Sequence, residues 1–169
     1  EFMRINQFYM ETSQNMAKYQ GLKTAGKEIE LKYLGVYVLT VTDNSTFKGV
    51  LNIADTVTAV NDKTFESSKE MVDYVNSQTL GDQVKVTYEE DGKVKTAEGK
   101  IITLENGKNG IGIGLIDRTE VSSDVPIKFS TAGIGGPSAG MMFSLSIYTQ
   151  IADPTLRNGR IIAGTGSID

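Results

Sequence analysis

The sequence predicts an α+β protein: a small β-barrel or curled sheet with one helix, followed by a segment of mixed α/β type. Two observations predict this class. Strand-like runs, one capped helix and a hairpin follow one another between residues 36 and 102. After residue 125, a strand-like run, a glycine-rich loop and a long apolar run follow in turn. The 169 residues suffice for one ordinary domain or two small ones.

The N-terminal segment has helical character between residues 4 and 26. Apolar residues recur there among Gln, Asn, Met and Lys, and Gly21 and Gly26 weaken its far end. We predict a packing helix, or a linker that leads into the next domain, and we assign residues 1–28 to it.

Two strands open the β-rich block. Residues 36–41 and 57–60 are strands by residue type, because β-branched and aromatic side chains dominate both runs. Asp43-Asn44-Ser45 between them has the composition of a turn.

A capped helix follows the second strand. Ser67 and Glu70 have the spacing of a capping box, in which a serine side chain and a glutamate three residues on satisfy the first backbone N–H groups. The helix is expected to run to about Gln78, with Met71, Val72, Tyr74 and Val75 as its apolar side.

A hairpin closes the block. Residues 84–88 alternate with a period of two, Asp91-Gly92 is a strong hairpin turn, and residues 94–102 return as the partner strand.

The order and spacing of these features resemble a PDZ domain of the bacterial, permuted type. The matching segments are Tyr33-Leu34-Gly35-Val36-Tyr37-Val38, residues 54–63, the helix from Ser68, and residues 81–84. The resemblance covers residues 29–116 and implies a PDZ domain there. One departure is Thr56-Val57-Thr58-Ala59, which places threonines where aliphatic residues are usual.

The resemblance implies a peptide-binding groove between the first strand and the helix. A glycine before an edge strand leaves backbone N–H groups able to hold a carboxylate, and the strand can then pair with an extended peptide. The predicted peptide-binding residues are Tyr33, Leu34, Gly35, Val36, Tyr37, Val38, Met71 and Val75. The two helix residues could equally belong to the core, because the sequence does not separate the two helix faces.

The glycine-rich run from Gly110 to Gly114 is not a phosphate-binding loop. It lacks the Gly-x-Gly-x-x-Gly spacing, and no helix pattern follows it. We expect a terminal strand that leaves the barrel.

The composition excludes several kinds of site. The chain has neither cysteine nor histidine, which rules out disulfides, thiolate or imidazole zinc sites, a cysteine nucleophile and a Ser-His-Asp triad built from this chain alone. The net charge of −4, with both signs scattered, argues against nucleic acid as a partner. We expect no metal and no cofactor. No run approaches the roughly 20 apolar residues of a membrane span, so this piece is expected to be soluble.

The last third of the chain has a different character. Residues 126–130 and 160–163 are predicted strands, and residues 139–151 are a predicted helix that is apolar almost all round. Asp153-Pro154 is expected to end this helix, because proline disfavours helical backbone in the preceding residue. The pattern is mixed α/β.

Ser138 is the candidate nucleophile. It lies in Gly135-Gly136-Pro137-Ser138-Ala139-Gly140, where small residues permit a sharp turn and a close approach of substrate. The start of a helix supplies unpaired N–H groups and a positive dipole end, as a nucleophile and its oxyanion need. The alternative is that Ser138 only caps the helix, which is worth about 1 kcal/mol.

The wider run resembles the proteolytic domain of Lon-type proteases. Gly135 to Met141, with Ala163-Gly164-Thr165-Gly166-Ser167-Ile168 further on, carry the resemblance, which covers residues 121–169. We assign residues 117–169 to an incomplete domain of this type. Together with the PDZ domain, the chain is similar to the PDZ-containing Lon-like serine proteases of Gram-positive bacteria.

This resemblance implies a serine endopeptidase with a Ser-Lys dyad. Ser138 would be the nucleophile and Thr165 would support the dyad, while the backbone of Gly136, Pro137 and Ala139 would form the oxyanion site. The family's lysine would fall after residue 169, so this fragment is expected to be inactive while its parent is active. Lys128 is the nearest lysine in sequence, but a strand lysine is more often solvated.

The family also implies protein or peptide substrates, a membrane-tethered parent with its protease outside the cytoplasm, and possible homo-oligomers. Two other functions remain open from the sequence. One is a non-catalytic PDZ module that binds peptides, with residues 121–169 acting only as structure. The other is an α/β-hydrolase esterase, suggested by the Gly-x-Ser-x-Gly match at Ser138, which requires acid and histidine partners from outside this chain.

Overall fold

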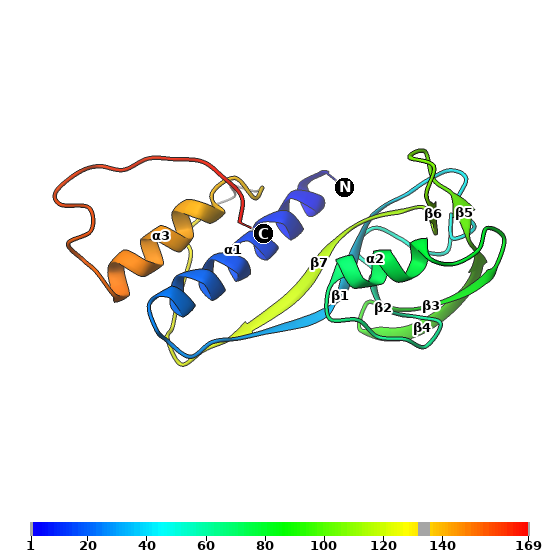
Figure 1. Ribbon diagram of the computed structural model, residues 1–169, viewed down its shortest axis with the longest axis horizontal. Helices are drawn as coiled ribbons and strands as arrows, with labels where there is room; N and C mark the ends of the chain where they lie inside the picture. The colour runs from blue at the N-terminus through cyan, green and yellow to red at the C-terminus, as the bar shows by residue number, and fades with distance from the viewer. Residues whose placement is uncertain (1, 132–135, 169) are drawn as a thin grey trace. The chain divides into compact units, whose positions relative to one another are not determined.

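The computed structural model describes residues 2–131 and 136–168. It divides into two compact units, one formed by residues 33–118 and the other by residues 1–32 together with 119–169. The chain passes from one unit to the other within β1 and returns within β7 (Figure 1). The N-terminal helix and the C-terminal segment, which we had predicted as separate segments, therefore belong to the same unit.

The unit of residues 33–118 is an α+β arrangement of strands with one helix. Its main sheet has the order β4-β3-β2-β1-β7, and β5 pairs with β6 in a second, two-stranded sheet. The elements are β1 (Glu30–Val41), β2 (Thr56–Val60), α2 (Ser68–Asn76), β3 (Gln83–Glu90), β4 (Lys93–Lys100), β5 (Ile102–Thr103), β6 (Asn109–Gly110) and β7 (Ile113–Ser122).

The β3–β4 hairpin is confirmed. Every second residue of β3 points into the core, namely Val84, Val86 and Tyr88. The pairing of β3 with β4 is uninterrupted from Gln83 opposite Lys100 to Glu90 opposite Lys93. The two turn residues between the strands both have positive φ, 49° at Asp91 and 76° at Gly92, as a tight hairpin turn requires.

The capping box of α2 is confirmed at Ser67, whose side chain accepts a hydrogen bond from the backbone N–H of Glu70 at 3.2 Å. In return the Glu70 carboxylate accepts from the backbone N–H of Glu66 at 3.0 Å, one residue earlier than the motif predicts. The helix ends at Asn76, two residues before the expected end.

The core lies between the sheet and α2. Its most deeply buried members come mainly from β1, β2, β3 and the turn after β1, with Met71 from α2 and Ile101 after β4; the others include Val36, Val38, Phe47, Val57, Val60, Val84 and Val86. The unusual threonines of β2 have hydrogen-bond partners. Buried Thr56 accepts from Arg118 Nη1 at 2.9 Å, and Thr58, at an irregularity between Val57 and Ala59, donates to the carbonyl of Thr87.

The other unit contains α1 (Phe2–Thr24) and α3 (Gly140–Ile151), which pack against each other (Figure 1). Small residues allow the close approach: a Cβ atom at Gly21 would lie 2.8 Å from Ile147 Cγ2, and one at Gly140 would lie 2.5 Å from Ser13 Oγ. The prediction of an N-terminal packing helix is thereby confirmed.

The predicted strands at residues 126–130 and 160–163 are wrong, because neither segment has regular secondary structure. Residues 125–129 instead lie along α3, where their side chains line a cavity. β-Branched and aromatic composition favours extended backbone, but a strand also needs a partner to pair with. The structure gives these two segments none among the described residues.

Candidate functional site

The predicted peptide groove depends on a free edge at β1, and that edge is already occupied. β1 pairs with β2 through Val36 opposite Val57 and Tyr37 opposite Thr56, and β7 is its neighbour on the other side. The expectation of an unpaired edge strand at Gly35–Val38 is therefore wrong. Whether these residues bind a peptide stays a prediction.

β7 lies antiparallel to β1. The backbone N–H of Thr42 donates to the carbonyl of Gly112 at 2.8 Å, and Gly114 lies against Thr40. Residue numbers therefore fall along β1 while they rise along β7, which means that the two strands run in opposite directions. β7 is the outer strand of the sheet on this side, so a peptide that extends the sheet here would pair with β7 and not with β1.

The predicted β1 residues are mostly interior. Val36, Tyr37 and Val38 are buried, whereas Tyr33 and Leu34 are half-buried. Gly35 has a different role from the one predicted: its φ is +130°, and a Cβ there would overlap the carbonyl oxygen of Val57 on β2. This glycine permits the close approach of two strands of the sheet.

The two predicted helix residues are members of the core. Met71 is 2% exposed and Val75 is 5% exposed. Together with Val72 they also line a small pocket of about 50 Å³ between α2 and the segment from Gly110 to Leu115. Core and groove are therefore continuous on this side of α2, which explains why the sequence could not separate the two roles.

The side chains of β7 alternate between two environments. Ile113 and Leu115 pack against the core beside α2. Two residues further on, a carboxylate oxygen of Asp117 accepts a hydrogen bond from the backbone N–H of Ser68, the first residue of α2, at 3.2 Å. A carboxylate at this end of a helix satisfies an unpaired donor and faces the positive end of the helix dipole. The sequence analysis assigned no role to this aspartate.

The opposite face of β7 is fixed by Arg118. Its guanidinium lies 5.4 Å from the ring centre of Tyr37 and donates to Thr56 Oγ1 at 2.9 Å. Glu89 Oε1 on β3 is 3.5 Å away. The Arg118 side chain thus links β7 to β1, β2 and β3, while Asp117 links β7 to the start of α2.

The hydroxyl of Tyr33 is buried close enough to Asp117 and Glu70 to be affected by their charges, and it has no hydrogen-bond partner among the described residues. Burial raises the pKa of Tyr33, and the negative charges of Asp117 and Glu70 raise it further. The phenol therefore stays neutral at physiological pH.

Ser138 is exposed and does not cap α3. The helix begins at Gly140, its N-cap residue is Ala139, and no side chain caps it. The hydroxyl of Ser138 makes no hydrogen bond to any of the residues that the structure describes. The alternative of a capping serine is therefore wrong.

The backbone of Ser138 is held by the C-terminal segment. Its carbonyl accepts from Thr165 Oγ1 at 3.1 Å and from the backbone N–H of Gly166 at 2.8 Å. The backbone N–H of Met141 in turn donates to the Gly166 carbonyl at 3.0 Å. Thr165 thus contacts the predicted nucleophilic residue, but through the serine's carbonyl and not its hydroxyl.

The predicted oxyanion donors differ in availability. The N–H of Gly136 donates to the carbonyl of Asn6, and Pro137 has no N–H, so neither offers a free donor. The Pro137 carbonyl accepts from Ser13 Oγ and from the N–H of Gly140. Only the N–H of Ala139 has no partner within the described part of the chain. Gly135 lies outside the described residues.

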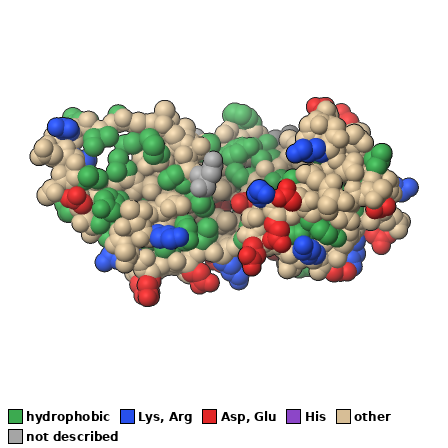
Figure 2. Space-filling model, in the orientation of Figure 1, with side chains coloured by type: hydrophobic (Ala, Val, Ile, Leu, Met, Phe, Trp, Pro, Cys, Tyr) green, Lys and Arg blue, Asp and Glu red, His purple; other side chains and the backbone are tan. Residues whose placement is uncertain are grey.

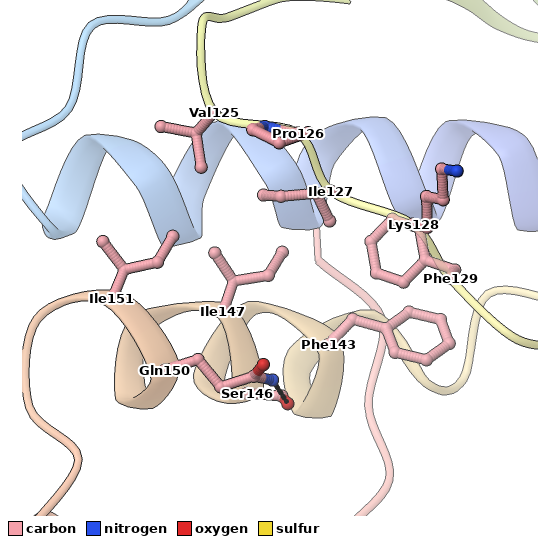
Figure 3. A pocket seen from close by; sticks show the side chains of 10 residues that line it. All are labelled: Val125, Pro126, Ile127, Lys128, Phe129, Phe143, Ser146, Ile147, Gln150 and Ile151. Carbon is pink, nitrogen blue, oxygen red and sulfur yellow. Dashed lines mark hydrogen bonds between the residues drawn. The ribbon is translucent and has the colours of Figure 1, made fainter.

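A cavity of about 230 Å³ lies along α3, between this helix and residues 125–129 (Figure 3). Its lining is largely aliphatic and aromatic, and the rings of Phe129 and Phe143 are 4.7 Å apart. The amine of Lys128 points away from α3 (Figure 3). No described lysine is hydrogen-bonded to Ser138.

The described residues include neither a metal-ligand cluster nor a membrane-spanning helix. Within residues 2–131 and 136–168, no group of three or more acidic side chains gathers as a metal site would require. None of the described helices has the length and apolar character to cross a membrane. On the face in Figure 2, lysine and arginine side chains are interspersed with aspartate and glutamate.

Several solved structures are similar to about half of this chain. Among solved structures, it is similar to the PDZ domain of an SdrC-like protein from Listeria monocytogenes, with 36% identity over 52% of this chain and 93% of that one, and a TM-score of 0.48. The corresponding domain from Listeria innocua has 36% identity over 48% and 92%, with a TM-score of 0.46. A protein of Geobacillus thermodenitrificans has 30% identity over 47% and 94%, with a TM-score of 0.43. A search of curated proteins found no match.

The PDZ resemblance is confirmed, whereas the resemblance of residues 121–169 to Lon-type proteases stays a prediction. The family model for the PDZ domain matches residues 7–101, which is more than half of the 169 residues. The chain therefore belongs to the PDZ domain family.

Proposed function

We propose that this chain is a peptide-recognition module whose PDZ domain binds an extended protein segment along α2. One observation carries the proposal: a pocket lies between α2 and β7, and β7 is the outer strand of the sheet. Met71, Val72 and Val75 line this pocket from α2, Ile113 and Leu115 line it from β7, and the N–H of Ser68 at the first turn of the helix donates to Asp117.

These are the components of strand addition. Main-chain hydrogen bonds to the sheet supply affinity, and pockets for alternate side chains supply specificity. Burying one aliphatic side chain contributes about 1.5–3 kcal/mol, so two such contacts suffice for a measurable complex only when little else is lost on binding. We therefore expect modest affinity.

The test is selection of random dodecapeptides displayed on phage, followed by fluorescence anisotropy with the selected peptides. Val72 lines the pocket but is only half-buried, so Val72→Arg blocks the groove while sparing the core. We expect a loss of affinity of about tenfold or more. Lys69→Ala, on the same helix and 85% exposed, is the matched control and should bind normally. Failure to select a peptide, or equal binding by Val72→Arg, would contradict the proposal.

A second candidate function is that of a Lon-like serine endopeptidase, with Ser138 as the nucleophile. It is favoured by the exposed hydroxyl, which has no capping role, and by the contacts that hold the Ser138 backbone. In this reaction the Ser138 oxygen attacks the peptide carbonyl, a neutral amine accepts the hydroxyl proton, and that proton passes to the leaving amine. The N–H of Ala139 is available to the developing oxyanion.

A fluorophosphonate probe and a peptide substrate test this candidate. No described lysine is hydrogen-bonded to Ser138, so we expect no peptide turnover by this chain alone. With a lysine-bearing segment added in trans, labelling should depend on Ser138. It should be lost in Ser138→Ala and kept in Ser130→Ala, which removes an exposed serine outside the turn. Labelling that survives Ser138→Ala would exclude Ser138 as the nucleophile.

A further inference from the structure

We infer that Leu104 sets the size of the side chain that the pocket beside α2 accepts, and that the peptides bound there carry alanine or valine at the position that enters this pocket. The inference rests on the proposed peptide-binding function and adds the chemistry of the ligand. Leu104 lies in the turn between β5 and β6, and the sequence analysis assigned no role to it.

α2 and the segment that faces it run in opposite directions. The carboxylate of Asp117 accepts from the N–H of Ser68 at the start of α2. The side-chain amide of Asn109 donates to the carbonyl of Gln78, just after the end of α2, at 2.8 Å. The residues that line the pocket on both segments fall between these two contacts. The hairpin of β5 and β6 is therefore held at the C-terminal end of α2, where Leu104 reaches the pocket.

The backbone of Leu104 is fixed by its own turn. Its N–H donates to the Lys108 carbonyl at 2.8 Å, and its carbonyl accepts from the Gly107 N–H at 2.9 Å. Its side chain lies against Gly110 of β6, where a Cβ atom would be 2.6 Å from Leu104 Cδ1. The glycine thus leaves room for the leucine side chain to form one end of the pocket.

Other parts of the pocket wall are less free to change. Met71, Val75 and Ile111 are buried core residues, with at most 5% of each exposed. Leu104 is only half-buried and lies outside the core cluster that the described residues form. Its size can therefore change at lower cost to the fold than theirs.

The volume of the pocket limits what can enter it. An apolar cavity of about 150 Å³ holds benzene, which has six carbon atoms. The pocket beside α2 has about 50 Å³, a third of that volume, and so has room for about two or three carbon atoms. Alanine and valine side chains, with one and three carbon atoms, fit this room, whereas leucine and phenylalanine are too large.

The lining decides the chemistry of the side chain that enters. It is apolar apart from the side chain of Asn76. A charged side chain would lose its water there without gaining enough partners, so an aliphatic one is favoured. One methylene too many for an apolar pocket changes affinity about tenfold or more. Replacing valine by leucine at the entering position should therefore weaken binding by about this factor.

The experiment selects peptides from one phage library of random dodecapeptides on three chains: wild type, Leu104→Ala and Leu80→Ala. Leu80→Ala is the matched control, because it makes the same substitution at a leucine that is 58% exposed and does not line the pocket. In the wild-type pool, one position should be restricted to alanine and valine. In the Leu104→Ala pool this position should also accept leucine and isoleucine, since the wall has lost three carbon atoms. The Leu80→Ala pool should match wild type.

Fluorescence anisotropy then compares a peptide selected on wild type with its leucine variant at that position. The wild-type chain should bind the leucine variant about tenfold more weakly, and Leu104→Ala should remove or reverse this difference. Circular dichroism establishes that each chain is folded. If Leu104→Ala does not fold, Leu104→Val takes its place; it removes a single carbon atom and should shift the preference in the same direction.

The results separate the two claims. If the selected peptides lose affinity for Val72→Arg, but the preferred side-chain size is the same on wild type and Leu104→Ala, the peptide-binding function stands and the inference about Leu104 falls. A wild-type pool with leucine or phenylalanine at every apolar position would also overturn the inference. If no chain selects a peptide, the peptide-binding function fails, and the inference fails with it.

Discussion

At the scale of single residues, Gly35 is required because of a contact with a residue far away in the sequence. The resemblance pointed to backbone N–H groups that hold a carboxylate. In the fold, this glycine has a positive φ and lies against the Val57 carbonyl of the neighbouring strand. A contact with a residue 22 positions away (57 − 35) cannot be read from the flanking residues.

Gly35→Ala should lower the free energy of unfolding by about 3 kcal/mol, because it adds a steric overlap to an unfavourable φ. Gly107→Ala separates the two effects. Its φ is +78°, but an added Cβ would meet nothing within 4 Å, so it should cost about 1 kcal/mol. Urea denaturation measures both, and equal losses would show that the Val57 contact is unimportant.

Asp55 gives a pH dependence with a definite sign. It is 4% exposed, and burial raises its pKa, opposed by a hydrogen bond from the Asn52 N–H. With a raised pKa, the native state binds more protons than the unfolded state, so this group's contribution to stability falls as pH rises from about 4 through the folded-state pKa. Asp55→Asn should flatten the stability curve over this window, while Asp124→Asn, at an exposed position, should leave its slope unchanged. Urea midpoints between pH 4 and 7 test this; a steeper curve for Asp55→Asn would refute it.

At the scale of elements, local signals predicted α2, the β3–β4 hairpin and α3, because caps, turns and periodicity are set by neighbours in the chain. The pairing of β7 was not predicted. The run from Gly110 to Gly114 indicated a strand that leaves the barrel, but the choice of β1 as partner depends on residues about seventy positions away, such as Thr42 and Gly112. For the same reason, the extended segment at residues 126–130 was mistaken for a strand.

The packing of α1 on α3 can be tested at Gly21. Alanine there should gain about 1 kcal/mol from helix propensity, but its Cβ would lie 2.8 Å from Ile147 Cγ2 and 3.0 Å from the Ser144 carbonyl. We expect a net loss of about 1 kcal/mol, because overpacking costs more than propensity returns. In a double-mutant cycle with Ile147→Ala, the loss should shrink. A purely additive cycle would mean that the two side chains do not meet.

At the scale of the whole molecule, the PDZ unit is inserted between α1 and the segment that carries Ser138, so the second unit is built from both ends of the chain. The sequence predicted the presence of a PDZ domain because its motifs are contiguous, whereas the predicted bounds 29–116 stay a prediction. It could not predict that α1 and residues 119–169 share one unit, since this requires the chain to return across the whole insertion. The candidate serine was identified from its motif alone, but its lack of a capping role required the structure.

Hydrogen exchange of the β7 amides, with and without a phage-selected peptide, tests the central claim most directly. β7 is the outer strand of the sheet and lines the pocket beside α2, so a bound peptide that extends the sheet should pair with its free side. The amides of residues 113–118 should then gain protection as the peptide saturates. Unchanged protection of β7 in a saturated complex would contradict the account, because it would place the peptide elsewhere.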